Sequence, residues 1–393
     1  MKSIINIGSN FENKLFLVRL DLNVPMSKLK IVDTNRIDKV IPTLKYLLNK
    51  RAKIIIISHL GRPKGRKVND LSLKPICENL SLQLNQEVKL IDEDLNKLKK
   101  EELSDNYQNQ VLVLENIRFY KEEELNSSSF AKKIASLGDF YINEAFSCSH
   151  RSHASISEIT KNIDSFAGLL FVKEINALKK ITSEISNPIT CIIGGSKISS
   201  KIQVIENLIP KFDNIVILGG MANNFLKYKK INIGKSIFEK NSENIVKKLL
   251  NLSKKSNCNL YFPEDVNTGK HFNDKSTVKK VTELEDDDII LDIGEKTISK
   301  VISIINSSKT ILWNGPAGYF ENPNFAKGSF EIAKKIAKNT SEGKLYSVLG
   351  GGDTVSVINK INLFESYNFV STAGGAFLEY LEGKELPGIK ALN

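Results

Sequence analysis

The feature that most constrains the fold of this chain is a regular alternation of short aliphatic segments with amphipathic ones. Eleven segments rich in β-branched and aliphatic residues have the length of a strand, and they lie at 15–20, 53–58, 111–114, 140–143, 189–193, 215–218, 260–262, 289–292, 310–313, 346–349 and 369–371. Between several of them apolar residues recur at helical spacing, as at 37–48 and 325–338. Strands that alternate with helices predict parallel sheets flanked by helices, in which ligands bind at the carboxyl ends of the strands.

The length of the chain predicts two domains. At 393 residues, 41% of them hydrophobic, the chain has enough apolar side chains for two cores. Apolar residues at 172, 175, 178, 181 and 185 follow a helical period, which the pair Asn187-Pro188 ends. We expect this helix to join the two domains, although the same pattern is also typical of an ordinary core helix.

The net charge of +11 fits either a basic surface for nucleic acid or a lysine-rich solvated surface. Acidic runs at 122–124 and 286–288 interrupt the lysine pairs, which favours the second interpretation. The four cysteines, Cys77, Cys148, Cys191 and Cys258, form no CxxC pair, a usage typical of reduced thiols. Since no segment resembles a signal peptide or a membrane span, the sequence predicts a cytoplasmic protein.

Arginine and glycine are segregated along the chain. All seven arginines lie before residue 152, whereas every run of adjacent glycines lies after residue 193. Arginine grips an oxyanion with a planar fork of donors, and a glycine turn before a helix lets backbone N–H groups approach a phosphate. The two halves are therefore predicted to bind different anionic molecules. Pairing of the arginines with carboxylates is the structural alternative.

Polar side chains near the strand ends of the first half form a first candidate site. Asp21 and Asn23 lie two residues apart at a strand end, so both side chains point to the same side. Cationic donors are supplied by Arg36, His59, Arg62, Arg118 and Arg151. Together these residues predict a pocket for a small phosphate or carboxylate. His150 and His153 have no third ligand at a metal-site spacing, and we interpret them as members of a polar network.

Glycine turns after strands form a second candidate site. Gly194-Gly195 precedes Lys197 and Lys201, which are four residues apart and would share one face if the segment is helical. The segment matches neither GxxxxGK[ST] nor GxGxxG, so neither Walker chemistry nor a dinucleotide fingerprint is supported. Further strand ends supply Glu321, Gly350, Gly351, Gly352, Asp353, Thr354, Gly374 and Gly375. Backbone donors in these turns suit phosphate, the carboxylate at 353 suits magnesium carried by a nucleotide, and the carboxylate at 321 suits ribose hydroxyls.

Eight segments in a fixed order give the chain a family resemblance. They are VRLDLNVP, SHLGRP, LENIRFY, YINEAFSCSHRSHAS, IIGGSKISSKI, WNGPAGYFE, GGGDTV and STAGGAFLEYLEGKELPG. On these residues the chain resembles phosphoglycerate kinases over nearly its whole length. The resemblance implies a monomeric enzyme of two Rossmann-like lobes, without a nucleic-acid or membrane partner. It also implies reversible transfer of a phosphoryl group between 1,3-bisphosphoglycerate and ADP, with Mg²⁺, giving 3-phosphoglycerate and ATP.

The resemblance further implies which parts do what. An N-terminal lobe at 1–171 would bind the triose, an inter-domain helix at 172–188 would act as a hinge, a C-terminal lobe at 189–375 would bind the nucleotide, and a segment at 376–393 would return to the first lobe. The triose would contact Asp21, Asn23, Arg36, His59, Arg62, Arg118 and Arg151. The nucleotide would contact Lys197, Lys201, Glu321, Gly350, Gly351, Gly352, Asp353 and Thr354, with the metal on Asp353. As the lobes close, the transferring group would be stabilised by Arg36, Lys201, Gly374 and Gly375.

The chain departs from that family at four positions. It has Glu144 where Asp is common in the family, Ser147 where Gly is common, Glu295 where Pro is common and Ala373 where Gly is common. None of these departures removes a charge from either candidate site.

Two other classes of protein stay open on the residues alone. One is a nicotinamide-dependent dehydrogenase, which the absence of a GxGxxG motif argues against. The other is a basic nucleic-acid-binding protein, which the net charge of +11 would suit.

Overall fold

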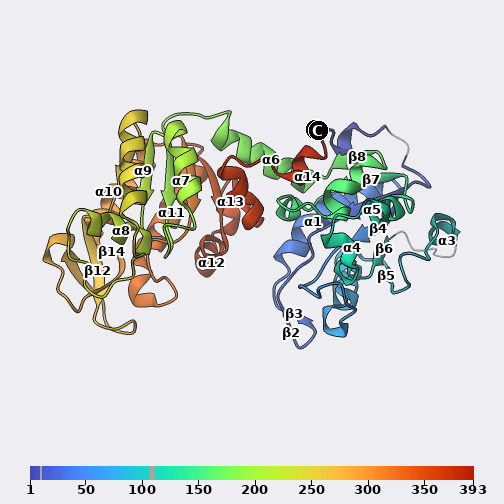
Figure 1. The fold of residues 1–393 in the computed structure, drawn as a ribbon, viewed down its shortest axis with the longest axis horizontal. Helices are drawn as coiled ribbons and strands as arrows, with labels where there is room; N and C mark the ends of the chain where they lie inside the picture. The colour runs from blue at the N-terminus through green and yellow to red at the C-terminus, as the bar shows by residue number, and fades with distance from the viewer. Residues whose placement is uncertain (9–10, 106–110) are drawn as a thin grey trace. The chain divides into compact units, whose positions relative to one another are not determined.

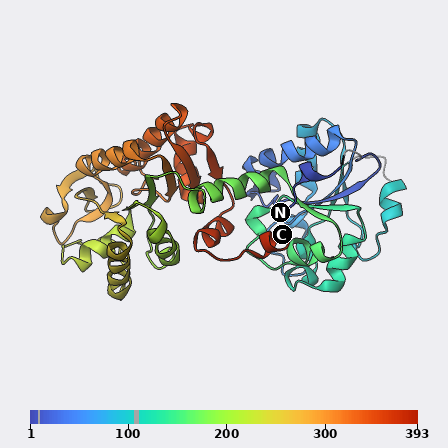
Figure 2. The ribbon, with the colours of Figure 1, turned by 90° about the horizontal axis from the view of Figure 1, so that it is seen from above.

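The computed structural model describes residues 1–8, 11–105 and 111–393. The chain forms two compact units, one of Met1–Ile175 with Glu385–Asn393 and the other of Asn176–Lys384. Each unit contains a six-stranded parallel sheet with helices on both faces (Figure 1, Figure 2), which is the fold class that the alternation predicts. Across the described residues, no helix combines the length and the apolar character that crossing a bilayer requires.

The first unit is built around β1 (Leu15–Arg19), in the strand order β5-β6-β4-β1-β7-β8. The other strands are β4 (Lys53–Ile57), β5 (Val88–Ile91), β6 (Val111–Leu114), β7 (Phe140–Asn143) and β8 (Ser165–Ala167). Side chains alternate between two apolar layers, since Phe16 and Val18 pack into one core and Leu15 and Leu17 into the other. The strands that lead to the first candidate site, β6, β4, β1 and β7, are neighbours in this order.

Helices cover this sheet on both faces (Figure 1). They are α1 (Asn35–Asn49), α2 (Lys74–Leu84), α3 (Lys100–Asp105), α4 (Lys121–Glu124), α5 (Ser128–Ala135), the beginning of α6 (Leu169–Thr182) and α14 (Pro387–Lys390), and a short antiparallel pair, β2 (Met26–Ser27) and β3 (Lys30–Ile31), precedes α1. The N–H of Gly388 in α14 donates to the carbonyl of Ser149 over 2.9 Å. A Cβ at residue 388 would lie 2.6 Å from Oγ of Ser149, so this close approach requires glycine.

A buried carboxylate holds the beginning of α6. Glu144, directly after β7, accepts from the N–H groups of Leu170 (2.9 Å) and Phe171 (3.0 Å), two donors that a helix start leaves unpaired. The hydroxyl of Thr43 on α1 donates to the same carboxylate. Burial raises the pKa of Glu144, although these donors oppose the rise. Gly168 faces this group, and a Cβ there would lie 2.1 Å from Oε2 of Glu144.

The second unit has a larger set of elements around the strand order β11-β10-β9-β15-β16-β17. These strands are β9 (Ile189–Ile193), β10 (Asn214–Ile217), β11 (Asn259–Tyr261), β15 (Thr310–Asn314), β16 (Tyr346–Gly350) and β17 (Phe369–Ser371). The helices are α7 (Ile202–Leu208), α8 (Gly220–Tyr228), α9 (Glu243–Ser256), α10 (Glu295–Ser307), α11 (Lys327–Ser341), α12 (Gly352–Lys360) and α13 (Gly375–Leu381). Five neighbouring strands, from β10 to β17 in the sheet, each lead into a loop that contains glycine.

This unit also contains a small sheet that the alternation does not predict. β12 (Asp265–Gly269) pairs antiparallel with β13 (Thr277–Lys280) and with β14 (Ile289–Ile293). No α-helix lies between residues 265 and 293, and successive strands without a crossover helix pair antiparallel. β12 contains Asp, Asn and Gly, which are unusual in strands because they favour turns. Here Asp265 accepts from the N–H of Thr297 at the start of α10 over 2.7 Å.

Candidate active site

The carboxyl ends of β1 and β4 bring a carboxylate, a guanidinium and an imidazole together. Oδ2 of Asp21 accepts from Nη1 of Arg36 over 2.6 Å, and the same Nη1 donates to the carbonyl of Asn23 over 3.2 Å. Oδ1 of Asp21 lies 4.0 Å from Nε2 of His59. The side chain of Asn23 accepts from the N–H of Gly61 over 2.8 Å, which ties the two strand-end loops together. The structure thus joins four of the residues predicted for the first site.

Buried neighbours set the protonation of this group. Arg19 is fully buried and donates to Nδ1 of His59 over 3.3 Å, so the ring proton lies on Nε2 and faces Asp21. Burial and the charge of Arg19 hold the pKa of His59 well below its usual range, which leaves the ring neutral at pH 7. Burial opposes ionisation of Asp21, but His59, Arg36 and the hydroxyl of Ser147, which donates to Oδ2, bring its pKa below the usual value.

Two more predicted arginines follow β6 and β7 at the same edge of the sheet. Arg118 donates from Nη1 to the carbonyl of Gly61 over 2.9 Å, while its buried Nε finds no hydrogen-bond partner in the described part of the chain. Nε of Arg151 donates to Nε2 of His150 over 3.1 Å. Arg62 is exposed on the loop after β4. Nε of Arg118 lies 3.6 Å from Oε1 of Glu124, an ion pair without a hydrogen bond. A guanidinium beside the like charges of Arg19 and Arg151 suits an anionic ligand.

His153 lies in a buried polar network behind these arginines. Its Nδ1 is 3.7 Å from Oε1 of Glu123, and Glu123 accepts from both the N–H (2.9 Å) and the hydroxyl (2.6 Å) of Ser155. Burial, together with the charges of Arg118 and Arg19, lowers the pKa of His153 to about 3. The ring is therefore neutral at pH 7 and adds no charge to the site.

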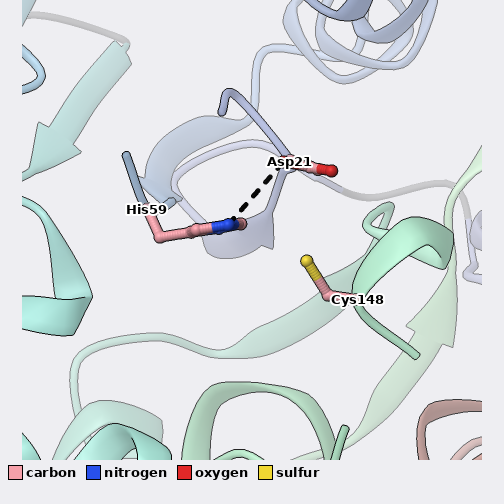
Figure 3. A group of neighbouring side chains, drawn as sticks. All are labelled: Asp21, His59 and Cys148. Carbon is pink, nitrogen blue, oxygen red and sulfur yellow. Dashed lines mark ion pairs between the residues drawn. The ribbon is translucent and has the colours of Figure 1, made fainter. Parts of the chain in front are cut away.

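Asp21, His59 and Cys148 are residues of metal-binding type whose ligand atoms lie within 4.8 Å of one another (Figure 3). Their other contacts oppose a cation. Asp21 is paired with Arg36, and a metal on Nε2 of His59 would move the ring proton to Nδ1, where it would meet the donor of Arg19. Burial raises the pKa of the Cys148 thiol, which keeps it protonated. The geometry at this edge suits an anion better than a metal ion.

In the second unit, glycine lets the loops after β9 and β15 approach each other. A Cβ at residue 194 would lie only 1.9 Å from the carbonyl oxygen of Pro316. Nζ of Lys201 donates to the carbonyls of Gly194 (2.9 Å) and Asn314 (3.1 Å), and also to Oδ1 of Asn314. Burial lowers the pKa of Lys201 to about 8. A buried ammonium with this pKa gains its charge fully when an anion binds beside it.

A cavity of about 280 Å³ in the second unit is bordered by both carboxylates predicted for the second site, Glu321 and Asp353. The backbone of Gly219 and Gly220 also lines it. Asp353 is exposed in the first turn of α12, whose N–H groups carry partial positive charge. Gly351 before it has a φ of 99°, a conformation that favours glycine.

The remaining residues predicted for the second site have different environments. Thr354 is buried, and its hydroxyl accepts from the N–H of Gly315 over 2.7 Å, so it fastens the loop after β15 to α12. Gly350 is buried at the end of β16, and its carbonyl accepts from Nδ2 of Asn314 over 2.6 Å. Lys197 is exposed and, like Lys201, precedes α7, so the expectation that the two lysines share one face of a helix is wrong. Gly374, with a φ of 56°, precedes α13.

Three residues that contact the candidate site residues are not predicted from the sequence. Arg19 is a charged residue at the end of an apolar strand, a signal that it needs buried partners. Asn314 ends β15 beside the glycine turn, where a strand-end amide invites a ligand or loop contact. Ser147 stands out only as a departure from the glycine common in the family that the chain resembles, and a serine in a loop does not by itself indicate a contact with Asp21.

Comparison with known proteins shows the family to which the chain belongs. The phosphoglycerate kinase family matches residues 6–384. The chain is 46% identical to a phosphoglycerate kinase of Wolbachia pipientis wMel, and the match covers 98% of this chain and 96% of that protein. It is 43% identical to a phosphoglycerate kinase of Orientia tsutsugamushi (strain Ikeda), and that match covers 97% of this chain and 95% of the relative. The solved phosphoglycerate kinase of Coxiella burnetii superposes with a TM-score of 0.91 at 37% identity, with 99% and 98% covered. Nothing in these matches supports a dehydrogenase or a nucleic-acid-binding protein. The chain belongs to the phosphoglycerate kinase family, whose members are phosphotransferases with a carboxyl group as acceptor.

Proposed function

We propose that the first unit binds 3-phosphoglycerate or 1,3-bisphosphoglycerate and that the second unit binds ATP or ADP. The observation that carries this proposal is the group formed by Asp21, Arg36 and His59. It combines a carboxylate that can accept from a substrate hydroxyl with a neutral imidazole donor and a fixed guanidinium. Asn23, Arg62, Arg118 and Arg151 would complete the triose site, the arginines by holding the phosphate.

On the nucleotide side, the proposal assigns the phosphates to glycine turns and lysines and the ribose to Glu321. The contributing residues are Lys197, Lys201, Gly350, Gly351, Gly352, Asp353 and Thr354. Support comes from the buried ammonium of Lys201 beside the loops after β9 and β15, and from the cavity that Glu321 and Asp353 share. Thr354 would act indirectly, through the loop that its hydroxyl holds.

The chemistry of the transfer asks little covalent help from the protein. A carboxylate oxygen of 3-phosphoglycerate forms a bond to the γ-phosphorus of ATP, the bond to the β–γ bridging oxygen breaks, and ADP leaves without any proton transfer. The protein has to align the reactants and neutralise charge on the three equatorial oxygens. We assign that charge to Arg36 and Lys201, with the backbone donors at Gly374 and Gly375.

The residues of the second unit fit a magnesium ion carried by the nucleotide. Asp353 offers an exposed carboxylate at the cavity, and no other acidic residue crowds it into a cluster among the described residues. Mg²⁺ is typically held by one or two carboxylates together with substrate phosphates and water. When bound, it would neutralise phosphate charge.

A coupled assay with ATP, Mg²⁺ and 3-phosphoglycerate tests the proposed activity. Formation of ADP that depends on 3-phosphoglycerate is expected, and ADP formation that is independent of it would contradict the proposal.

We also propose that the protein is a cytoplasmic monomer without a nucleic-acid or membrane partner. Support for the reducing compartment comes from the four cysteines, which are all buried and unpaired with one another.

Ser147→Ala is expected to raise the KM for 3-phosphoglycerate about tenfold, the effect of losing one hydrogen bond to a charged group. The hydroxyl donates to Oδ2 of Asp21, so its removal leaves Arg36 as the remaining side-chain donor to that oxygen. Loss of this donor raises the pKa of Asp21, and the acid limb of kcat/KM should move to higher pH. Steady-state kinetics across pH checks both effects, and Ser152→Ala, an exposed serine of the same loop, is the matched control.

Binding of MgADP is expected to weaken as the pH rises through about 8. Burial puts the pKa of Lys201 at about 8, so the ammonium is charged below that pH and neutral above it. Because the anionic ligand favours the charged form, binding near this pH should take up a proton. Calorimetry in two buffers of different ionisation enthalpy measures the uptake. In Lys201→Gln the uptake should vanish, and its persistence would mean that another group titrates.

The two ligand sites that we propose lie in different units of the chain, so the reaction requires that the bound substrates be brought together. Small-angle scattering is expected to show a smaller radius of gyration with both ligands bound than with neither. An unchanged radius in an enzyme that turns over would contradict closure.

A further inference from the structure

Two buried groups of opposite charge lie behind the triose site that we propose. Arg19 and Glu123 are both fully buried, and Nη2 of Arg19 lies 3.9 Å from Oε1 of Glu123. A guanidinium stays protonated in a protein, so a buried arginine requires a counter-charge and partners for its donors. Glu123, on α4, supplies that counter-charge to the last residue of β1.

Ser155 joins the two charged groups. Nε of Arg19 donates to Oγ of Ser155 over 2.8 Å, and this hydroxyl donates in turn to Oε1 of Glu123 over 2.6 Å. The N–H of Ser155 donates to Oε2 of Glu123 over 2.9 Å, and its carbonyl accepts from the hydroxyl of Tyr141 over 2.6 Å. Every polar group of Ser155 is therefore engaged, so its hydroxyl has one fixed direction. Ser155 lies in a π-helical turn at Ala154–Glu158, a rare element that is frequent at functional sites.

The remaining donors of Arg19 face the site. Nη1 donates to the carbonyl of Leu20, and Nη2 donates to Nδ1 of His59 over 3.3 Å. Because the guanidinium is planar, fixing Nε and Nη1 also fixes the direction of Nη2. A donor aimed at Nδ1 leaves the ring proton of His59 on Nε2, which lies 4.0 Å from Oδ1 of Asp21 (Figure 3).

These contacts form one chain of buried groups that runs from α4 to the ends of β1 and β4. Its members, in order, are Glu123, Ser155, Arg19, His59 and Asp21. We infer that Glu123 and Ser155 are positioning residues of the triose site, which act through Arg19 to hold the ring proton of His59 on the nitrogen that faces Asp21. When Ser155 loses its hydroxyl, the guanidinium is free to turn, and the ring can place its proton on Nδ1 instead. The inference rests on the proposed triose site.

The tautomer of His59 tests the inference directly. The chain has four histidines, so the ring signals of a protein labelled with ¹⁵N-histidine can be assigned from single replacements. Long-range ¹H–¹⁵N correlation spectra at pH 7 should show the His59 ring of the parent enzyme with its proton on Nε2 alone, and the same ring in Ser155→Ala with both tautomers. A parent ring that is protonated on Nδ1, or on both nitrogens, would overturn the inference without any variant.

The kinetic consequence is a weaker complex with the triose. Ser155→Ala is expected to raise the KM for 3-phosphoglycerate about tenfold, because a hydrogen bond to a charged group is lost. The values of kcat and of the KM for ATP should change little, since His59 is not among the residues that we assign to the transferring group. Glu123→Gln, which keeps the shape and removes the counter-charge, should change the tautomer and the KM in the same direction.

Ser157→Ala is the matched control. Ser157 lies in the same turn, but its hydroxyl donates to Oδ1 of Asn126 over 3.2 Å and to the carbonyl of His153 over 3.3 Å, away from Arg19 and Glu123. In this variant the His59 tautomer and the KM for 3-phosphoglycerate should both stay as in the parent.

The two readouts have to change together. In Ser155→Ala, a new tautomer without a rise in KM would separate the ring proton from substrate binding, and a rise in KM without a new tautomer would leave Ser155 a structural role only. Either result would overturn the inference. If Ser155→Ala does not fold, the parent spectrum and Glu123→Gln decide the question. If His59 responds as expected while the parent enzyme shows no turnover that depends on 3-phosphoglycerate, the proposed function fails instead.

Discussion

Replacement of Arg36 by alanine is expected to lower kcat about 10³-fold, with a far smaller change in the KM for 3-phosphoglycerate. Nη1 of Arg36 is held by Asp21 and by the carbonyl of Asn23, so the guanidinium is in place before a substrate binds. Charge that is positioned in advance stabilises the transition state more than the ground state. Steady-state kinetics with both substrates varied separates the two quantities.

Arg36→Lys and Arg51→Ala are the matched variants for this test. Arg36→Lys keeps the charge and removes the fork of donors, so a rate between those of the parent and the alanine variant is expected. Arg51 is exposed, and its Nη1 lies 3.5 Å from Oε1 of Glu12. Neither residue belongs to a proposed site, so removal of Arg51 should leave the kinetics unchanged. If Arg36→Ala raised KM and left kcat intact, Arg36 would be a binding residue only.

Gly352→Ala is expected to lower the affinity for MgADP at least about tenfold without loss of thermal stability. Nothing lies within 4 Å of a Cβ placed at this position, and alanine is more favourable than glycine in a helix by up to about 1 kcal/mol. If the backbone N–H groups at the start of α12 cradle phosphate, the new methyl group occupies space that the phosphate needs. Calorimetric titration and thermal unfolding measure the two properties separately.

Gly194→Ala gives the contrasting result. Its Cβ would meet the carbonyl oxygen of Pro316 at 1.9 Å, so the variant should lose stability by about 1–3 kcal/mol whether or not nucleotide is present. A Gly352→Ala enzyme that binds MgADP as tightly as the parent would mean that the phosphates bind elsewhere.

The strands and the loops at their ends could be predicted from the sequence because both depend on local patterns. A run such as Ile54–Ile57 is buried on both faces of a parallel sheet and therefore reads as continuous apolar sequence. Because parallel strands end at one edge, side chains as far apart as residues 21 and 151 could be predicted to lie at the same edge of the sheet.

What the sequence could not supply are the contacts that depend on tertiary structure. β12 is a strand made of Asp, Val, Asn, Thr and Gly, and it forms because Asp265 and Asn267 find partners at α10 and β14. The neutral state of His59 depends on its own burial and on the charge of Arg19, and the position of Asp21 depends on Ser147, 126 residues away. No local pattern encodes such pairings.

The carboxylate that starts α6 has an evolutionary consequence. Because Glu144 fills the space in front of Gly168, a side chain can enter at 168 only when the one at 144 becomes shorter or turns away. A shorter acid at 144 would in turn have to reach the same two amide groups and the hydroxyl on α1 across a wider gap. Substitutions at these two positions should therefore be inherited as a pair, and either one alone would loosen the helix at the boundary between the two units.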